Sequence, residues 1–338
     1  MKNATALAVA LLALVVAACG GASDEVGGKS DTTQAAGSGG AASTKLSLVA
    51  YAVPKVGFDK VIPAFDKTPE GKGVGFKTSF GASGDQSRAV EAGLPADVVS
   101  FSTEPDMTRL VKAGLVPDDW KSQTPHDGLV TTSLVSFVVR PGNPKNIKTW
   151  DDLLKPGIEV VTPNPFTSGA AKWNLLGAYA HGGLPYVEKL IHDHVKVQPK
   201  SGREALQTFT GGEGDVLISY EYEATTAQKK GTKVDYVIPP DTVKIDIDLA
   251  KTKSAPPAAQ QFLDYVLSEP AQQRFANWGY RPVNPAVLAE NKSKFPDPPT
   301  VKTIDDLGGW TKLNDELFDP ENGSIAKIES DAGVSTAS

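Results

Sequence analysis

Residues 129–140 read Leu-Val-Thr-Thr-Ser-Leu-Val-Ser-Phe-Val-Val-Arg, and residues 243–249 read Val-Lys-Ile-Asp-Ile-Asp-Leu. Both runs have the β-branched composition that favours strands. Each lies between groups of units in which a short strand precedes a helix. We therefore interpret them as crossover strands, through which the chain leaves a first lobe and later returns to it. This predicts a first lobe formed by residues 45–135 and 245–330, and a second lobe formed by residues 136–244.

Short strand-like runs followed by amphipathic helices recur through the rest of the body. Residues 46–53 and 96–101 are apolar or β-branched, and a helical pattern follows each of them. Gly114 ends the second of these helices. The same order of strand and helix recurs at residues 160–180 and from Val216 onwards. Such repeats predict an α/β fold with largely parallel sheets, and two such lobes place a ligand cleft between them.

The first residues indicate export. Lys2 precedes an uncharged apolar run that is shorter than the roughly 20 residues needed to span a membrane. Residues 16–20 read Val-Ala-Ala-Cys-Gly and resemble the bacterial lipobox, with Cys19 as the only cysteine. We expect a signal peptide at 1–18, a lipid on Cys19, and a flexible tether rich in Gly, Ser and Ala at 19–44. The alternative is an incidental thiol in an ordinary signal peptide.

The composition narrows the classes of function. The chain is 40% hydrophobic and 22% charged, as is ordinary for a globular protein with a packed core. Its net charge of −6 argues against a nucleic-acid partner. Because this charge would repel an anion, an anionic ligand would have to be held by local dipoles.

Three segments share the character of an anion site. Each is rich in Ser and Gly, follows a strand-like run and opens a helix: residues 81–84 (Gly-Ala-Ser-Gly), 167–170 (Thr-Ser-Gly-Ala) and 200–202 (Lys-Ser-Gly). The free backbone N–H groups and the positive dipole end of a helix start attract anions, and small residues let a ligand approach. The alternative is that these serines only cap their own helices.

A longer motif carries a resemblance to a known family. Residues 163–176 read Pro-Asn-Pro-Phe-Thr-Ser-Gly-Ala-Ala-Lys-Trp-Asn-Leu-Leu. This run resembles the signature of the prokaryotic sulfate-binding proteins of periplasmic-binding-protein type II, in which Asn-Pro and Ser-Gly-Gly precede an Arg-Trp-Asn helix. Further features of that family occur in the same order at residues 81–86, 140–145, 214–218 and 279–283. The resemblance extends from about Leu46 to Trp310.

The resemblance implies a two-lobed periplasmic-binding-protein-like fold with two crossover strands and a central ligand cleft. It implies a monomeric receptor that holds dehydrated sulfate through neutral donors and delivers it to the permease of an ABC importer, and the signal peptide and the lipid on Cys19 would place this receptor outside the cytoplasm, anchored to the membrane. Such a receptor is not an enzyme and needs no cofactor. Thiosulfate, molybdate or another tetrahedral oxyanion is the alternative ligand. An extracytoplasmic hydrolase is the alternative class.

The resemblance also assigns roles to particular residues. The ligand would be held by the hydroxyl groups of two serines and by the backbone N–H groups of four small residues: Ser83, Ser168, Ala52, Gly169, Ala170 and Gly202. Arg203 would support a helix start behind the site. Two departures stand out: Tyr220 replaces an indole donor of the family, and Tyr51-Ala52 replaces its Tyr-Asp. Because a phenol can both donate and accept a hydrogen bond, Tyr220 leaves the identity of the oxyanion open.

Hydrogen-bonding needs distinguish the two candidate ligands. Sulfate needs only donors, whereas protonated phosphate also needs a hydrogen-bond acceptor in the cleft, such as a carboxylate. Asp85 and Glu221 are the nearby carboxylates. We interpret Asp85 as a first-turn acid favoured by the helix dipole, and we expect Glu221 to hold the cleft architecture or to pair with a cation such as Arg203. His192 and His194 lie two residues apart on an expected helix, where side chains do not face each other, so we predict no metal site.

Overall fold

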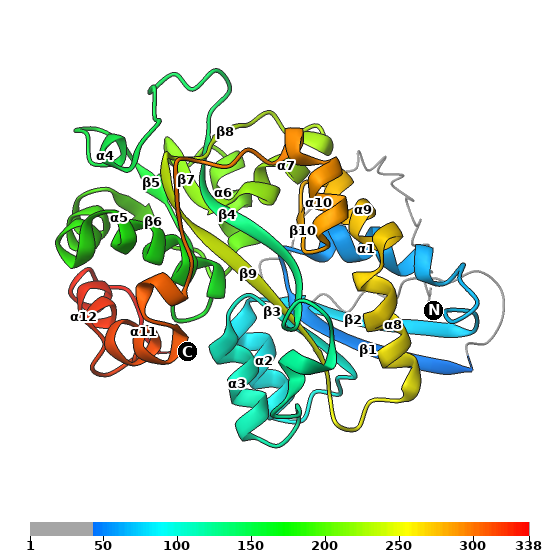
Figure 1. Cartoon of the computed structure of the whole chain (residues 1–338). Coiled ribbons are helices and arrows are strands. Elements are labelled where there is room, and N and C mark those ends of the chain that lie inside the picture. The colour runs from blue at the N-terminus through cyan, green and yellow to red at the C-terminus, as the bar shows by residue number, and fades with distance from the viewer. Residues whose placement is uncertain (1–42, 338) are drawn as a thin grey trace, which may run out of the picture.

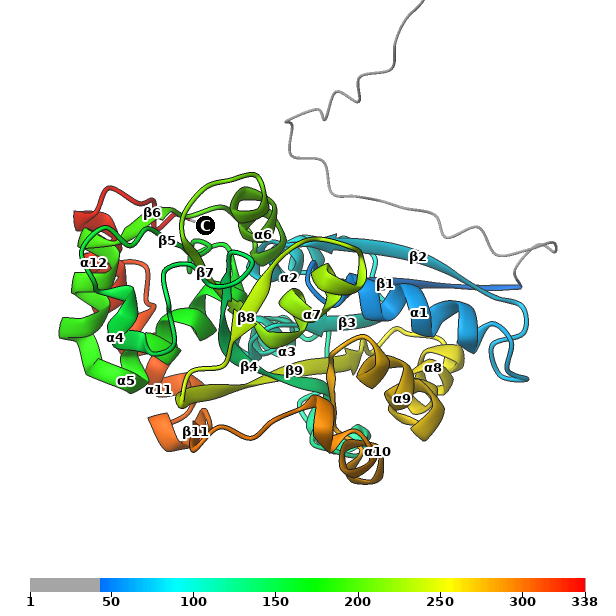
Figure 2. The same ribbon diagram turned by 90° about the horizontal axis from the view of Figure 1, so that it is seen from above.

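The computed structural model describes residues 43–337 of the chain (Figures 1 and 2). The predicted signal peptide, Cys19 and nearly all of the predicted tether lie outside these residues. In the part of the chain that is described, no helix combines the length and the apolar character that crossing a membrane requires.

Lobe 1 begins with a parallel sheet in the order β2–β1–β3. Its first elements are β1 (Thr44–Tyr51), α1 (Lys55–Phe65), β2 (Val74–Gly81), α2 (Ser83–Glu91), β3 (Val98–Phe101), α3 (Glu104–Lys112) and η1 (Trp120–Gln123). Successive strand residues point to opposite faces, so Leu48 and Ala50 join one core cluster while Val49 joins another. Both faces of this sheet are therefore covered, as parallel sheets require.

Lobe 2 contains a second parallel group in the order β7–β5–β6. Its elements are α4 (Trp150–Leu153), β5 (Val160–Val161), α5 (Gly169–Asp193), β6 (Val195–Val197), α6 (Gly202–Thr210), β7 (Val216–Tyr220), α7 (Glu221–Lys229) and β8 (Asp235–Val237). Ile218 faces the large core cluster and Leu217 faces a separate one, so this sheet is also buried on both faces.

Two long antiparallel strands join the lobes. They are β4 (Leu129–Val139) and β9 (Asp241–Lys251), which pair with each other at the centre of the molecule. The first half of β4 pairs with β9, and its second half pairs with β7 and β8 of lobe 2. The last residues of β9 pair with β3 of lobe 1. The two-lobed α/β fold with two crossover strands is thus confirmed, and Figure 2 shows both strands running between the lobes.

After β9 the chain first returns to lobe 1. There it forms α8 (Pro257–Leu267), α9 (Glu269–Asn277), β10 (Arg281–Pro282), α10 (Pro285–Glu290) and η2 (Lys292–Lys294). Helices α8 and α9 pack against α1. Phe275 of α9 contacts Phe58 edge to face, with their ring centroids 5.9 Å apart.

The C-terminal arm then departs from the expected boundary. It comprises β11 (Thr300–Lys302), η3 (Asp305–Leu307), α11 (Trp310–Leu317) and α12 (Ser324–Asp331). The prediction placed residues up to 330 in the first lobe, yet α12 packs against α5 of lobe 2, while α11 contacts α3 of lobe 1. Trp310 meets Trp173 edge to face with ring centroids 4.8 Å apart, which explains the attachment. Figures 1 and 2 both show α11 and α12 beside α5.

Candidate anion-binding site

A small cavity lies where loops of both lobes meet. Its free volume is only about 10 Å³, and its lining consists of uncharged residues: Tyr51, Ala52, Val53, Gly81, Ala82, Ser83, Ser168, Ala170, Ser201 and Gly202. The first six come from the ends of β1 and β2 and the positions that follow them. The last four stand at the starts of α5 and α6. The cavity is therefore shared between lobe 1 and lobe 2.

Three helices begin at this cavity, as the Ser- and Gly-rich segments predicted. Helix α2 begins at Ser83, α5 at Gly169 and α6 at Gly202. The first N–H groups of a helix have no partner within that helix, and the helix dipole gives them a partial positive charge. Three such starts around one small cavity form an environment that favours an anion, although no charged side chain lines it.

The capping alternative applies to one of the three segments. The Ser201 hydroxyl accepts a hydrogen bond from the Glu204 N–H at 3.2 Å and so caps α6. Ser168 occupies the N-cap position of α5, but its side chain makes no capping bond. Ser83 is already the first residue of α2, whose N-cap is Ala82. The hydroxyl groups of Ser83 and Ser168 are therefore not explained by capping.

Close contact between the lobes requires glycine at two helix starts. A Cβ atom added to Gly169 would lie 2.9 Å from both Cβ and Oγ of Ser102, which belongs to lobe 1. A Cβ atom added to Gly202 would lie 3.1 Å from Cγ2 of Val53. These positions bring the backbone of lobe 2 directly against lobe 1, next to the cavity.

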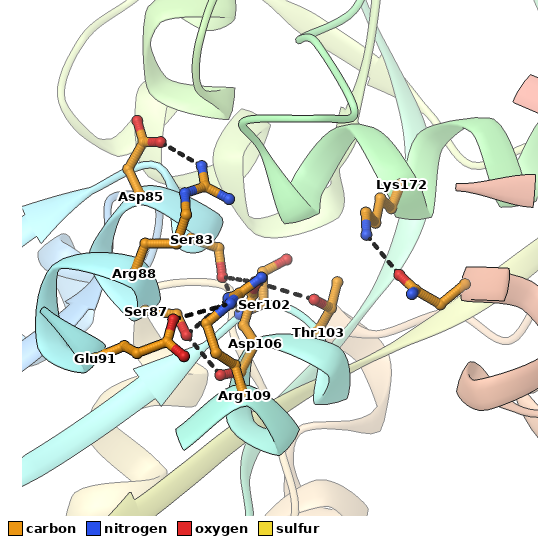
Figure 3. A network of polar contacts seen from close by, with 11 residues as sticks. Ser83, Asp85, Ser87, Arg88, Glu91, Ser102, Thr103, Asp106, Arg109 and Lys172 are labelled. Carbon is orange, nitrogen blue, oxygen red and sulfur yellow. Dashed lines mark hydrogen bonds and ion pairs between the residues drawn. The ribbon is translucent and has the colours of Figure 1, made fainter. Parts of the chain in front are cut away.

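The Ser83 hydroxyl belongs to a polar network in lobe 1. It donates to Oδ2 of Asp106 at 2.7 Å and accepts from the Ser102 N–H at 3.0 Å. Asp106 also accepts from Oγ1 of Thr103 at 3.0 Å and from Nη1 of Arg109 at 3.1 Å. Figure 3 shows these groups around Asp106. The hydroxyl must therefore turn away from Asp106 to donate to a ligand, and Thr103 and Arg109 would keep that carboxylate bonded.

Tyr220 lies near the cavity without lining it. Its side chain is buried at the end of β7, and its hydroxyl lies 2.6 Å from Oγ of Ser102. Burial raises the pKa of Tyr220 well above its ordinary value, and the hydrogen bond with Ser102 opposes that rise. The phenol therefore stays neutral. The other predicted donors Ala52, Ser83, Ser168, Ala170 and Gly202 line the cavity, and Gly169 lies directly beside it.

Arg203 lies between the lobes, and the cation that pairs with Glu221 is not Arg203. Its Nη2 donates to the carbonyl oxygen of Ala52 at 3.1 Å and so links lobe 2 to the first loop of lobe 1. Glu221 pairs with Arg281 instead, at 2.6 Å from Oε2 to Nε and 3.2 Å from Oε1 to Nη2. Both partners are buried, and Arg281 lies too far along the chain for a local pattern to reveal the pair.

Glu223 is a carboxyl near the cavity that sequence reasoning missed. It is buried in α7, accepts from Oγ of Ser219 at 3.1 Å, and its Oε2 would lie 3.6 Å from a Cβ atom added to Gly202. Burial raises the pKa of Glu223, and the nearby Arg203 guanidinium opposes the rise. Asp85, Glu221 and Glu223 all stand in first turns, so position alone does not tell which one faces the core. Asp85 pairs with Arg88 at 2.6 Å near the surface.

A metal site and a second hollow are the remaining candidates for a functional site. Among residues 43–337, no group of three or more His, Cys, Asp or Glu side chains is arranged to hold a metal ion. His194 bonds through Nδ1 to the carbonyl oxygen of Ile158 at 3.1 Å. A larger, open hollow of about 590 Å³ lies elsewhere, between Tyr236 and the prolines at 296, 298 and 299. It has no helix start and no cluster of donors, so it does not share the character of the cavity.

The two lobes, the crossover strands and a dipole-lined cavity between the lobes define the class of two-lobed solute-binding proteins. Comparison with known proteins agrees. The family of bacterial extracellular solute-binding proteins matches residues 46–281. The chain is also 38% identical to the sulfate-binding protein of Synechococcus elongatus over 97% of this chain and 95% of the relative. It therefore belongs to the bacterial extracellular solute-binding proteins, among the sulfate-binding and thiosulfate-binding relatives.

Two further likenesses refine this position. The thiosulfate-binding protein of Escherichia coli is 31% identical over 84% of this chain and 91% of that protein. The sulfate-binding protein SubI of Mycobacterium tuberculosis superposes with a TM-score of 0.79 at 50% identity, covering 82% of this chain and all of that structure. The structure of AfuA from Actinobacillus pleuropneumoniae, at 20% identity and a TM-score of 0.60, shares the fold alone.

Proposed function

We propose that the protein is an extracytoplasmic receptor that captures sulfate between its lobes and delivers it to the permease of an ABC importer. The observation that supports this most strongly is the meeting of three helix starts from both lobes at one small cavity without charged side chains. The relatives named for sulfate binding support the choice of ligand.

The proposed donors are all neutral. The backbone N–H groups of Gly169, Ala170 and Gly202 stand in first helical turns, where they have no intrahelical partner. The N–H of Ala52 and the hydroxyls of Ser83, Ser168 and Tyr220 complete the set. Sulfate is fully ionised at neutral pH and only accepts hydrogen bonds, so a site built from donors suits it.

Closure of the lobes follows from this arrangement. Ala52 and Ser83 belong to lobe 1, whereas Ser168, Gly169, Ala170 and Gly202 belong to lobe 2. A ligand bound by both sets is held more tightly in the closed form than in an open form, so binding shifts the population toward closure. The closed form would then be the one that the permease recognises.

The direct test is isothermal titration of the purified protein with sulfate, followed by thiosulfate, molybdate and phosphate. We expect 1:1 binding of sulfate that is strongly weakened in Ser168→Ala and unchanged in Ser330→Ala, an exposed serine of α12. Absence of heat or thermal shift with all four anions would contradict the proposal. Turnover of a chromogenic sulfate ester, lost in Ser168→Ala, would instead favour the hydrolase alternative.

Thiosulfate is the second candidate ligand. Tyr220 stands in place of the family's indole donor, and relatives named for thiosulfate binding match at 31% and 32% identity. If thiosulfate bound more tightly than sulfate in the same titration, the class of receptor would stand and the ligand would change.

We also propose that the receptor is monomeric and is held at the membrane by a lipid on Cys19, with residues 19–44 as its tether. Lobe 1 would comprise residues 45–135 and 245 to about 299, and lobe 2 residues 136–244 with the C-terminal arm. Cys19→Ser should release the protein from the membrane fraction in cell fractionation. Retention of that variant with the membranes would contradict the anchor.

A further inference from the structure

Ser102 occupies a central position between the lobes. It directly follows β3 in lobe 1 and is fully buried. Its N–H donates to Oγ of Ser83 at 3.0 Å, within the same lobe. Its carbonyl oxygen accepts from Nε1 of Trp173 at 2.6 Å, and its hydroxyl lies 2.6 Å from that of Tyr220. Trp173 and Tyr220 belong to lobe 2, so two of the three polar groups of Ser102 bond across the cleft.

The packing of Ser102 is equally tight. Its Cβ and Oγ would both lie 2.9 Å from a Cβ atom on Gly169, the first residue of α5. The Ser102 side chain therefore rests against a helix start that faces the cavity. It touches one proposed donor, Gly169, bonds to a second, Ser83, and pairs with a third, Tyr220.

The hydroxyl pair has a definite hydrogen-bonding capacity. Each hydroxyl carries one hydrogen and two lone pairs. One hydrogen joins Ser102 to Tyr220, and the second remains available to either oxygen. Tyr220 also packs edge to face on Tyr222, with ring centroids 5.4 Å apart, and the Tyr222 hydroxyl is hydrogen-bonded to that of Tyr51, which lines the cavity. The pair thus has one hydrogen left over beside the cavity, at a position that depends on how Ser102 holds the phenol.

We propose that Ser102 is a specificity-determining positioning residue: by holding the Tyr220 hydroxyl across the cleft, it sets the size and donor geometry of the oxyanion that the closed form accepts. This inference rests on the proposed function. Without the Ser102 hydroxyl, space opens beside Gly169 and the phenol loses its partner. A larger tetrahedral anion such as thiosulfate, whose sulfur is bulkier and a weaker acceptor than oxygen, should suffer less from this change than sulfate.

The chain contains a matched control for the experiment. Ser100 lies two residues earlier on β3 and is also fully buried, but its hydroxyl has no hydrogen-bond partner among the described residues. Ser100→Ala removes the same atom from a neighbouring buried serine that does not line the cavity. Tyr220→Phe removes the other hydroxyl of the pair and keeps the ring.

The test is titration calorimetry of the wild-type protein and these variants with sulfate and with thiosulfate. We expect Ser102→Ala to weaken sulfate binding roughly tenfold and thiosulfate binding much less, because one hydrogen bond near a charged ligand is lost. Tyr220→Phe should change the ratio of the two affinities in the same direction. The double variant should change it by less than the product of the single effects. Ser100→Ala should leave the ratio unaltered.

The possible failures are distinguishable. If the wild-type protein binds neither anion, the proposed function fails regardless of Ser102. Suppose that the wild-type protein binds sulfate, and that Ser102→Ala lowers the affinity for both anions by one common factor or leaves both affinities unchanged. Ser102 then has only a structural role, and the inference is overturned. Should Ser102→Ala not fold, an unchanged affinity ratio in Tyr220→Phe overturns the inference equally.

Discussion

The helix start at Ser83 and the helix start at Ser168 present the same side chain to one cavity, but their hydroxyls are held differently. In lobe 1, the Ser83 hydroxyl donates to Asp106, which is also bonded by Thr103 and Arg109. In lobe 2, the Ser168 hydroxyl makes no bond to its own helix. A ligand must therefore compete with a carboxylate for Ser83, whereas Ser168 is ready to donate. We infer that lobe 2 supplies most of the affinity, while lobe 1 contributes mainly on closure.

The largest expected effect comes from preventing contact between the lobes. Gly169→Val would place a branched side chain against Ser102, where even a Cβ atom would lie at 2.9 Å. We expect a loss of about 3 kcal/mol in sulfate binding, the upper end of overpacking costs, measured by calorimetry. Because the clash is between lobes, the unfolding temperature without ligand should change little. Unimpaired binding would mean that the lobes need not meet here.

A second test concerns the C-terminal arm, whose buried carboxyl group at Glu329 contacts lobe 2. Glu329 on α12 is fully buried, and Gln198, just before the α6 start, donates to its Oε2 at 2.8 Å. Burial raises the pKa of Glu329 from 4.5 to about 7, with the Gln198 bond opposing it. The folded state thus holds this proton more tightly than the unfolded chain does. Its stabilising effect is complete below a pH of about 4.5 and is lost as the pH rises through 7.

The shift corresponds to at most about 3 kcal/mol. Glu329→Gln keeps the shape of the side chain and removes its titration. We expect this variant to lose the part of the pH dependence of the free energy of unfolding that falls between pH 5 and 8, in urea titrations at several pH values. The wild-type protein should lose stability over the same interval. Parallel curves for the two proteins would contradict the role of Glu329.

The comparison of the two serines is tested next. Ser168→Ala removes a hydroxyl that is free to donate to the anion, so we expect a loss of about 2 kcal/mol in sulfate binding. Calorimetry at constant pH and salt would measure it. Ser201→Ala is the informative neighbour, because Ser201 lines the same cavity but caps α6; it should affect stability more than affinity.

The smallest effect is expected for Ser83→Ala. The hydrogen bond to the ligand is lost, but in the free protein the bond to Asp106 is lost as well, so the two changes partly cancel. We expect a loss of about 1 kcal/mol or less in sulfate binding. If Ser83→Ala weakened binding as much as Ser168→Ala, the difference between the lobes would have no energetic meaning.

The general architecture was predictable because its signals are local. The β-branched runs at 129–140 and 243–249 became β4 and most of β9. The Ser- and Gly-rich segments became three helix starts at one cavity, since strand ends and helix starts meet at the same edge of a parallel sheet. Strand propensity and helix-start signals over a few residues are sufficient to predict such features.

The features that were missed depend on residues far apart in the chain. Glu221 and Arg281 are sixty residues apart, and Trp173 meets Trp310 only after the chain has crossed between the lobes and returned. The direction of the Ser83 hydroxyl depends on Asp106, one strand further on. No pattern within one segment reports such contacts, because tertiary packing selects them.

The uncharged lining of the cavity also has a kinetic consequence. Helix-start dipoles act over a few ångströms, whereas the net charge of −6 acts over the Debye length, about 10 Å at 0.1 M salt. A dianion in dilute solution is therefore repelled before it is attracted. Added inert salt screens the repulsion more than the short-range attraction, so the rate of association should rise with ionic strength. A receptor of this construction collects its anion faster in a saltier medium.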